Sequence, residues 1–264
     1  MRTLIKSTIS PFAGIMVFML CICLSIHVKA ADRLYYQIKV YHLKNAQQVD
    51  RVEQYLKDAY LPAMHKLGIK NIGVFKPITD ADTSDRKLYV FIPFKNMDEL
   101  EATPAKLLKD DQYLANGKDY LDAVRPNEPY VRIETILLRA FAVAPGVTPP
   151  NLTSNKTERY YELRSYESAT EKYATSKLKM FEGEIAIFNK VNSNGVFYAQ
   201  VIAGARMPNL MYMTVYNDKK DMDDHWTAFF ATDEWKVLNA VPEYKGNVTK
   251  AERNFLHATP YSDF

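Results

Sequence analysis

Two short segments, residues 35–41 and 160–166, alternate polar and apolar positions and nearly repeat each other. The first reads Tyr-Tyr-Gln-Ile-Lys-Val-Tyr and the second Tyr-Tyr-Glu-Leu-Arg-Ser-Tyr. A period of two predicts a β-strand in each segment. Apolar residues at three- and four-residue spacing follow both segments and predict a long helix after each strand. The chain is therefore one structural unit written twice.

The same order of elements continues in both halves. Gly-led strands are expected at 68–76 and 195–202 and apolar strands at 87–94 and 209–216. In each half a charged helix, a short matching segment and a last strand follow. The matching segments are Asp111-Gln112-Tyr113 and Asp233-Glu234-Trp235. Each half thus reads β-α-β-β-α-β, the ferredoxin-like plan. The sequence predicts an α+β fold with tandem repeats at 32–142 and 158–264, joined by a Pro-, Ser- and Thr-rich linker at 143–157.

The first 31 residues have the pattern of a signal peptide. A positive start is followed by an apolar stretch at 12–26 and by Val28-Lys29-Ala30, a small-residue cleavage pattern. We expect cleavage near Ala30/Ala31 and an exported protein, periplasmic or secreted, with no stable membrane insertion afterwards. The alternative is an uncleaved anchor, since the apolar stretch approaches the shortest length that spans a bilayer. Both cysteines, Cys21 and Cys23, lie in this segment, so the exported part has no thiol.

The charge balance argues against a nucleic-acid partner. The full chain has 34 basic and 31 acidic residues, but three of the basic ones lie in the first 31 residues, which leaves a net charge near zero. Charges of both signs are interspersed and no basic run is present. Asn151, Asn155 and Asn247 stand in glycosylation sequons, which matter only if the host glycosylates.

The two faces of the first strands carry different chemistry, because alternate strand residues point to opposite sides. The more apolar set is expected to lie under the helices: Tyr36, Ile38, Val40, Tyr161, Leu163 and Ser165, joined by Met211, Met213 and Val215. The other set is Tyr35, Gln37, Lys39, Tyr41, Tyr160, Glu162, Arg164 and Tyr166, joined by Leu210, Tyr212, Thr214 and Tyr216. If two such sheets pack face to face as an α/β barrel, this second set would line the barrel interior. The pattern leaves open whether the barrel closes within one chain or between two chains of a homodimer.

The second half resembles the NIPSNAP family. Its domains begin with a Tyr-Glu-Leu-Arg-x-Tyr strand, matched here by residues 161–166, and end a helix in Asp-x-x-Trp or a close variant, matched by Asp233-Glu234-Trp235. The first half follows the pattern more loosely. The resemblance implies the dimeric α/β-barrel superfamily, which contains monooxygenases, isomerases, haem-dependent enzymes and members without known activity, so it does not determine function.

The sequence also departs from the family pattern. Family members often carry a His and a Trp on the third strand, where this chain has Tyr212 and Thr214, so an acid-base role for that His does not carry over. The Arg that is common on the following helix is missing from residues 218–225. The family-like residues that remain are Arg164, Tyr166, Tyr216 and Trp235.

The candidate ligand-binding residues come from the polar strand face: Arg164, Glu162, Tyr166, Tyr212, Tyr216, Lys39 and Tyr41. Arg is a forked donor that matches a carboxylate, so a small anionic or phenolic ligand is the expected partner. The competing interpretation is an internal ion pair between Arg164 and Glu162. The histidines outside the signal segment, at positions 42, 65, 225 and 257, form no metal-ligand spacing, so neither metal nor cofactor is predicted. Two hypotheses remain: a small-molecule binding or interaction module, and a cofactor-free monooxygenase or isomerase on an aromatic or carboxylic substrate.

Overall fold

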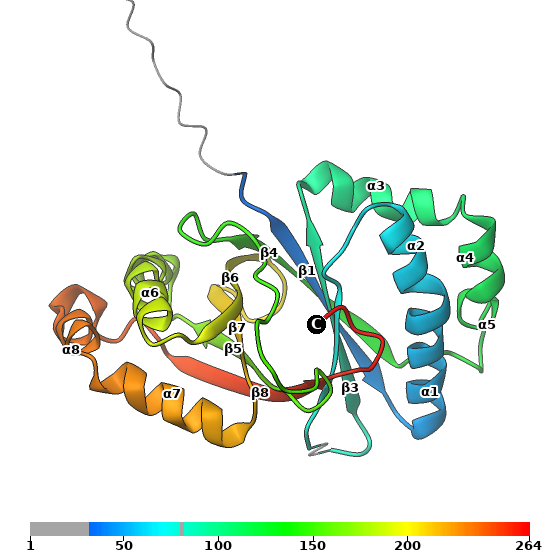
Figure 1. Cartoon of the computed structure of the whole chain (residues 1–264). Coiled ribbons are helices and arrows are strands. Elements are labelled where there is room, and N and C mark those ends of the chain that lie inside the picture. The colour runs from blue at the N-terminus through cyan, green and yellow to red at the C-terminus, as the bar shows by residue number, and fades with distance from the viewer. Residues whose placement is uncertain (1–31, 80–81) are drawn as a thin grey trace, which may run out of the picture. The chain divides into compact units, whose positions relative to one another are not determined.

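The computed structural model describes residues 32–79 and 82–264. The predicted signal peptide, with Cys21 and Cys23, lies outside these residues. The described residues form one compact unit. In it a strand sheet is flanked by two separate groups of helices (Figure 1).

Each half has four strands, as the repeat predicts. Those of the first half are β1 (Tyr35–Leu43), β2 (Gly73–Pro77), β3 (Arg86–Phe94) and β4 (Arg132–Ala140). Those of the second half are β5 (Tyr160–Glu167), β6 (Asn194–Ala203), β7 (Asn209–Tyr216) and β8 (Lys250–Ala258). The prediction of a strand from Gly68 is wrong: Gly68 has φ 83° and follows the helix end, and the strand begins at Gly73. Glycine adopts this left-handed conformation without steric cost and commonly ends helices.

The helices also follow the repeat. The first half has α1 (Ala46–Tyr55), a π-helical turn η1 (Leu56–Tyr60), α2 (Leu61–Lys66), α3 (Met97–Leu107), α4 (Asp111–Asn116) and α5 (Lys118–Leu121). The second half has α6 (Glu171–Lys190), α7 (Lys219–Ala231), α8 (Asp233–Ala240) and a 3-10 turn η2 (Pro242–Tyr244). Polar side chains start the main helices, since Asn45, Asn96, Thr170 and Asp218 each accept a hydrogen bond from a first-turn backbone N–H.

The eight strands close into one antiparallel barrel within a single chain. Their order is β1-β3-β2-β8-β5-β7-β6-β4, so each half contributes four adjacent strands in the ferredoxin-like arrangement. The halves join where β2 pairs with β8 and where β4 pairs with β6. Strands β1 and β5 therefore lie on opposite sides of the barrel, as the repeat predicts.

The predicted orientation of the strand faces is wrong. The barrel interior holds the more apolar set, and it forms one cluster with members from all eight strands: Tyr36, Ile38, Val40, Phe75, Tyr89, Phe91, Ile136, Leu138, Ala140, Tyr161, Leu163, Val196, Phe197, Ala199, Val201, Met211, Met213, Val215, Leu256 and Ala258. Phe264 completes the cluster, and the rings of Phe91 and Phe197 stack at 4.6 Å near its centre. The barrel is a packed core, so the predicted Tyr- and Arg-lined interior does not exist.

The reason for the reversal is geometric. An eight-stranded barrel is about wide enough for side chains to fill its interior, and in this one the side chains of the interior cluster are buried from water. The more apolar strand face therefore gains most by pointing inward. On the outer face, short helices leave room at their edges where the head of a Lys or Arg reaches water or a partner.

Candidate functional site

The outer face of the first-half sheet carries a cavity of about 260 Å³. Strand β1 supplies Gln37 and Lys39 to its wall, and α3 supplies apolar side chains around Pro104. Apart from Thr103, the rest of the lining is aromatic or aliphatic: Tyr55, Tyr60, Phe94, Leu100, Leu107, Leu108 and Tyr113. An engineered cavity of about 150 Å³ binds benzene, so this volume suits a substituted single ring or a small fused ring system.

Lys39 is the only cation in this wall. Its Nζ lies 5.1 Å from the centroid of the Tyr60 ring. Within residues 32–79 and 82–264 the structure gives it no hydrogen-bond or ion-pair partner, and burial alone lowers the pKa of its ammonium. A partly buried cation without a counter-ion is unfavourable, and an anion in the cavity would supply the missing partner.

The tyrosines of the wall come from the helix opposite β1. Tyr55 ends α1 and Tyr60 ends η1, and the Tyr55 hydroxyl lies 2.8 Å from that of Tyr113 on α4. Burial raises the pKa of both Tyr55 and Tyr60, so these hydroxyls stay protonated at neutral pH. Among the described residues the π turn occurs in this half, whereas the matching helix α6 of the second half is regular, and π turns often occur at functional sites.

The corresponding place in the second half is filled. Arg164 and Glu162 lie under α7, with Arg164 Nη1 3.3 Å from Glu162 Oε1. The Trp226 indole covers them: its Nε1 donates to Glu162 Oε2 at 2.8 Å, and the Arg164 guanidinium lies 4.3 Å from its ring centroid. Burial raises the pKa of the Glu162 carboxyl, and Arg164 and the indole N–H oppose this shift. The predicted internal ion pair is therefore present, with tryptophan as a third member.

The other predicted ligand residues also lie on the helix side rather than in the barrel. Tyr166 and Tyr212 join their hydroxyls at 2.8 Å beneath α6. Tyr216 is fully buried, 5.5 Å from the His225 ring. Tyr41 is buried edge-on against Tyr130 in the first-half core. Of the seven predicted residues, only Lys39 lines the first-half cavity, and Tyr166 lines a smaller hollow.

Other hollows in the described part of the chain lack a comparable charge. The one beside Tyr166, about 140 Å³, includes Lys177, but its ammonium is bonded to Glu184. A hollow of about 350 Å³ beneath the linker has no charged lining residue. A third, of about 380 Å³ beside α6, is bordered by the exposed Lys179–Glu243 pair and by Lys172, whose side chain is exposed to solvent. Among the hollows of the described residues, the first-half cavity is the one that combines several aromatic side chains with a partly buried cation that has no ion-pair partner.

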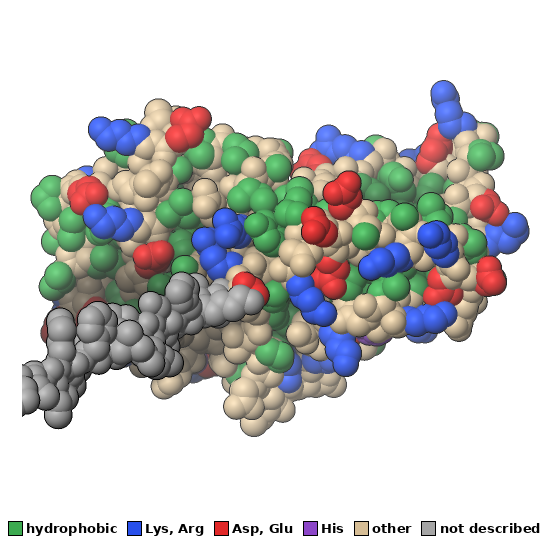
Figure 2. Space-filling model, turned by 90° about the horizontal axis from the view of Figure 1, so that it is seen from above, with side chains coloured by type: hydrophobic (Ala, Val, Ile, Leu, Met, Phe, Trp, Pro, Cys, Tyr) green, Lys and Arg blue, Asp and Glu red, His purple; other side chains and the backbone are tan. Residues whose placement is uncertain are grey.

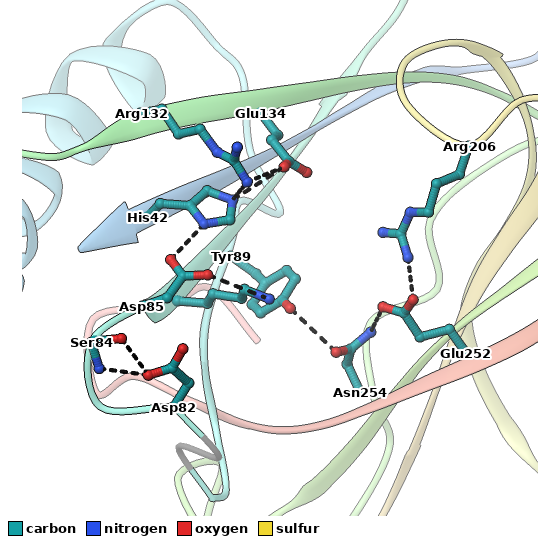
Figure 3. A network of polar contacts seen from close by, with 11 residues as sticks. His42, Asp82, Ser84, Asp85, Tyr89, Arg132, Glu134, Arg206, Glu252 and Asn254 are labelled. Carbon is teal, nitrogen blue, oxygen red and sulfur yellow. Dashed lines mark hydrogen bonds and ion pairs between the residues drawn. The ribbon is translucent and has the colours of Figure 1, made fainter. Parts of the chain in front are cut away.

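One end of the barrel carries a network of paired polar side chains (Figure 3). His42 at the end of β1 lies between two carboxylates, with Nδ1 2.6 Å from Asp85 and Nε2 3.3 Å from Glu134. Across the strands, Tyr89 donates to Asn254 at 3.3 Å. Nearly all of the charged side chains in this network have a partner. The network therefore links strands β1, β3, β4 and β8 and does not offer a free group for binding.

The face of the molecule seen in Figure 2 shows no large area of one charge. Lys and Arg side chains lie next to Asp and Glu side chains over the face seen in Figure 2, with apolar side chains between them. In the described residues no group of three or more His, Cys, Asp or Glu side chains is placed to hold a metal ion. None of the helices in residues 32–79 and 82–264 is long and apolar enough to cross a membrane.

The closed barrel of two ferredoxin-like halves is the fold of dimeric α/β-barrel proteins, here with both halves in one chain. Solved structures share this fold along most of the chain. A candidate monooxygenase from Lactobacillus acidophilus has a TM-score of 0.55 at 13% identity, covering 86% of this chain and 94% of its own. Another from Fusobacterium nucleatum has a TM-score of 0.51 at 9% identity, covering 86% and 93%. At these identities the similarity shows the fold alone.

The family assignment comes from the second half. Residues 161–263 match the NIPSNAP family model, so the C-terminal half of this chain carries a NIPSNAP domain. An uncharacterised NIPSNAP-like domain protein from Burkholderia xenovorans is 20% identical, with a TM-score of 0.36, and covers 40% of this chain and 90% of its own. No curated protein is similar enough to count as a match.

Sequence reasoning missed four residues of the two sites: Gln37 as a cavity residue, Tyr55 and Tyr60, and Trp226. Tyr55 and Tyr60 belong to an apolar helix stripe that looks like ordinary core. A signal for Trp226 did exist. Counted from the helix N-caps Asn96 and Asp218, it occupies the position of Pro104 in the first half.

Proposed function

We propose that this protein binds a small anionic or phenolic aromatic molecule in the first-half cavity. The observation that carries the proposal is the Lys39 ammonium, which faces an aromatic cavity and has no counter-ion among the described residues. Pockets of this kind, mostly apolar with one or two polar groups, are typical of small-molecule sites. Lys39 supplies the charge that orients the ligand, and the tyrosine rings supply the contact area.

Calorimetry with benzoate and with hydroxyl-substituted benzoates as ligands tests this function. Lys39→Met removes the ammonium and keeps an apolar side chain of similar length, so it should weaken binding of the acids at least about tenfold. Lys44→Met is the matched control, because Lys44 is an exposed lysine just beyond the end of the same strand. If Lys39→Met and Lys44→Met bind the acids equally well, the cavity is not the binding site.

A second candidate function is catalysis on the molecule bound in the same cavity. The specific observation is that Lys39 and the hydrogen-bonded pair Tyr55 and Tyr113 line the same cavity. There the ammonium and the hydroxyls would polarise a substrate oxygen. A cofactor-free monooxygenase or an isomerase would use such groups. Incubating the protein with a bound acid under air and analysing the product by mass spectrometry tests it: an unchanged mass and an unchanged chromatographic position count against catalysis.

A further inference from the structure

Each half has an equivalent site between its sheet and its helices, which is open in the first half and filled by Trp226 in the second. Lys39 and Arg164 occupy equivalent positions on β1 and β5, and so do Gln37 and Glu162, because Tyr35 pairs with Phe94 as Tyr160 pairs with Tyr216. Pro104 and Trp226 are equivalent on α3 and α7. In the first half the compact proline ring does not reach the strand, and a cavity of about 260 Å³ remains.

In the second half the Trp226 side chain occupies the corresponding space. It makes the contacts expected of a bound aromatic ligand, with its ring face on the cation of Arg164 and its polar edge on Glu162. Phe188 and Phe229 hold the indole from the sides, with ring centroids at 5.5 Å. Trp226 therefore shows where and how an aromatic group binds against this strand.

Charge decides how the two occupants differ. In the second half the positive charge of Arg164 is balanced by Glu162, so its occupant, the indole, is neutral. In the first half Gln37 replaces the acid and leaves the charge of Lys39 unbalanced. An occupant that restores the balance has to carry one negative charge.

We infer that Trp226 is a built-in occupant of the second-half site, and that the first-half ligand takes the same position as a planar aromatic acid. Its ring lies over the Lys39 ammonium, and its polar edge reaches the Gln37 amide. This inference rests on the proposed function and adds to it the ligand's charge, its orientation and the residue that sets the charge preference.

The test uses two probes with the same ring system, indole-3-carboxylate and indole, and the variant Gln37→Glu. The wild-type protein should bind the acid about tenfold or more tightly than indole, because only the acid carries a negative charge that balances the charge of Lys39. Gln37→Glu rebuilds the second-half charge arrangement. This variant should weaken binding of the acid at least tenfold and bind indole more tightly than the acid.

The second-half site is tested separately with Trp226→Ala. This variant should melt at a lower temperature than wild type, and millimolar indole should recover several degrees of that loss, whereas indole-3-carboxylate should recover less because Glu162 repels it. Trp226→Phe is the control, since it fills most of the space without the N–H donor and should respond little to indole.

The outcomes separate the inference from the proposed function. If the wild-type protein binds neither probe nor any other aromatic acid, the proposed function fails. If the acid binds and Lys39→Met abolishes it, but Gln37→Glu leaves the preference unchanged, the function stands and the inferred position is wrong. If indole does not stabilise Trp226→Ala more than it stabilises Trp226→Phe, the indole is ordinary packing and not a stand-in for a ligand.

Discussion

Replacing Arg164 and replacing Lys39 should have opposite consequences for stability, although the repeat makes the two residues equivalent. Arg164→Met leaves the Glu162 carboxylate, which is 0% exposed, with the Trp226 N–H as its remaining direct partner. Breaking a buried pair in this way costs about 3–5 kcal/mol. For a domain of this size each kcal/mol lowers the melting temperature by roughly 2–4 °C, so a fall of about 6–20 °C is expected.

Lys39→Met is the matched variant. It removes a cation that has no carboxylate partner in the described residues, so it strands nothing and replaces an unfavourable burial with an apolar one. Its melting temperature should equal or slightly exceed that of the wild type. The double variant Arg164→Met with Glu162→Gln should recover much of the loss, because the stranded charge is gone.

The pH dependence gives a second readout of the same change. A buried acid whose folded-state pKa is raised contributes stability below its unfolded pKa and loses it as the pH rises through the folded value. Glu162 already has a raised pKa, and losing Arg164 raises it further. The deficit of Arg164→Met should therefore be larger at pH 8 than at pH 5 in thermal melts. A small deficit, one that does not depend on pH, or one matched by Lys39→Met would refute the role given to this ion pair.

Three further expectations follow from the site, the core and the surface. Burial lowers the pKa of Lys39 below its ordinary value near 10.4. Binding of an aromatic acid should therefore weaken as the pH rises through that lowered pKa, because the ammonium loses its charge. Calorimetry across pH 7–10 would show no change in affinity if the ammonium played no part. Phe91→Ala removes a ring stacked on Phe197 inside the barrel and should cost about 3–5 kcal/mol in denaturant unfolding; a loss below 1 kcal/mol would contradict a filled barrel. In a glycosylating host, mass spectrometry should find a glycan at the exposed Asn151 or Asn155 and none at Asn247, which is 4% exposed. A glycan at Asn247 in folded protein would contradict the packing of that residue.

Much of the fold could be predicted from the sequence because its signals are local. The alternation in 35–41 and 160–166 defines strands, the spacing of apolar residues defines helices, and their repetition predicts two ferredoxin-like halves. The pairing of Arg164 with Glu162 was one of two interpretations that the strand pattern allowed. The predicted elements and this ion pair both depend on residues that are neighbours in the chain or in one strand.

Which strand face points inward was decided by the tertiary structure. Alternation shows that Ile38 and Lys39 point to opposite sides, but it does not say which side becomes the closed interior. Only when eight strands form one ring does one face become an enclosed interior, which here is filled by the more apolar side chains, and this sends Lys39 and Arg164 to the helix side.

The difference between the two sites was likewise decided in three dimensions. Gln37 against Glu162 and Pro104 against Trp226 are visible as differences between the halves, yet neither predicts a cavity by itself. The cavity depends on how far a side chain on α3 or α7 reaches toward a strand more than fifty residues away in the chain. A proline ring leaves that space open and an indole closes it, so the sequence determined the two halves and their packing determined which one has room for a ligand.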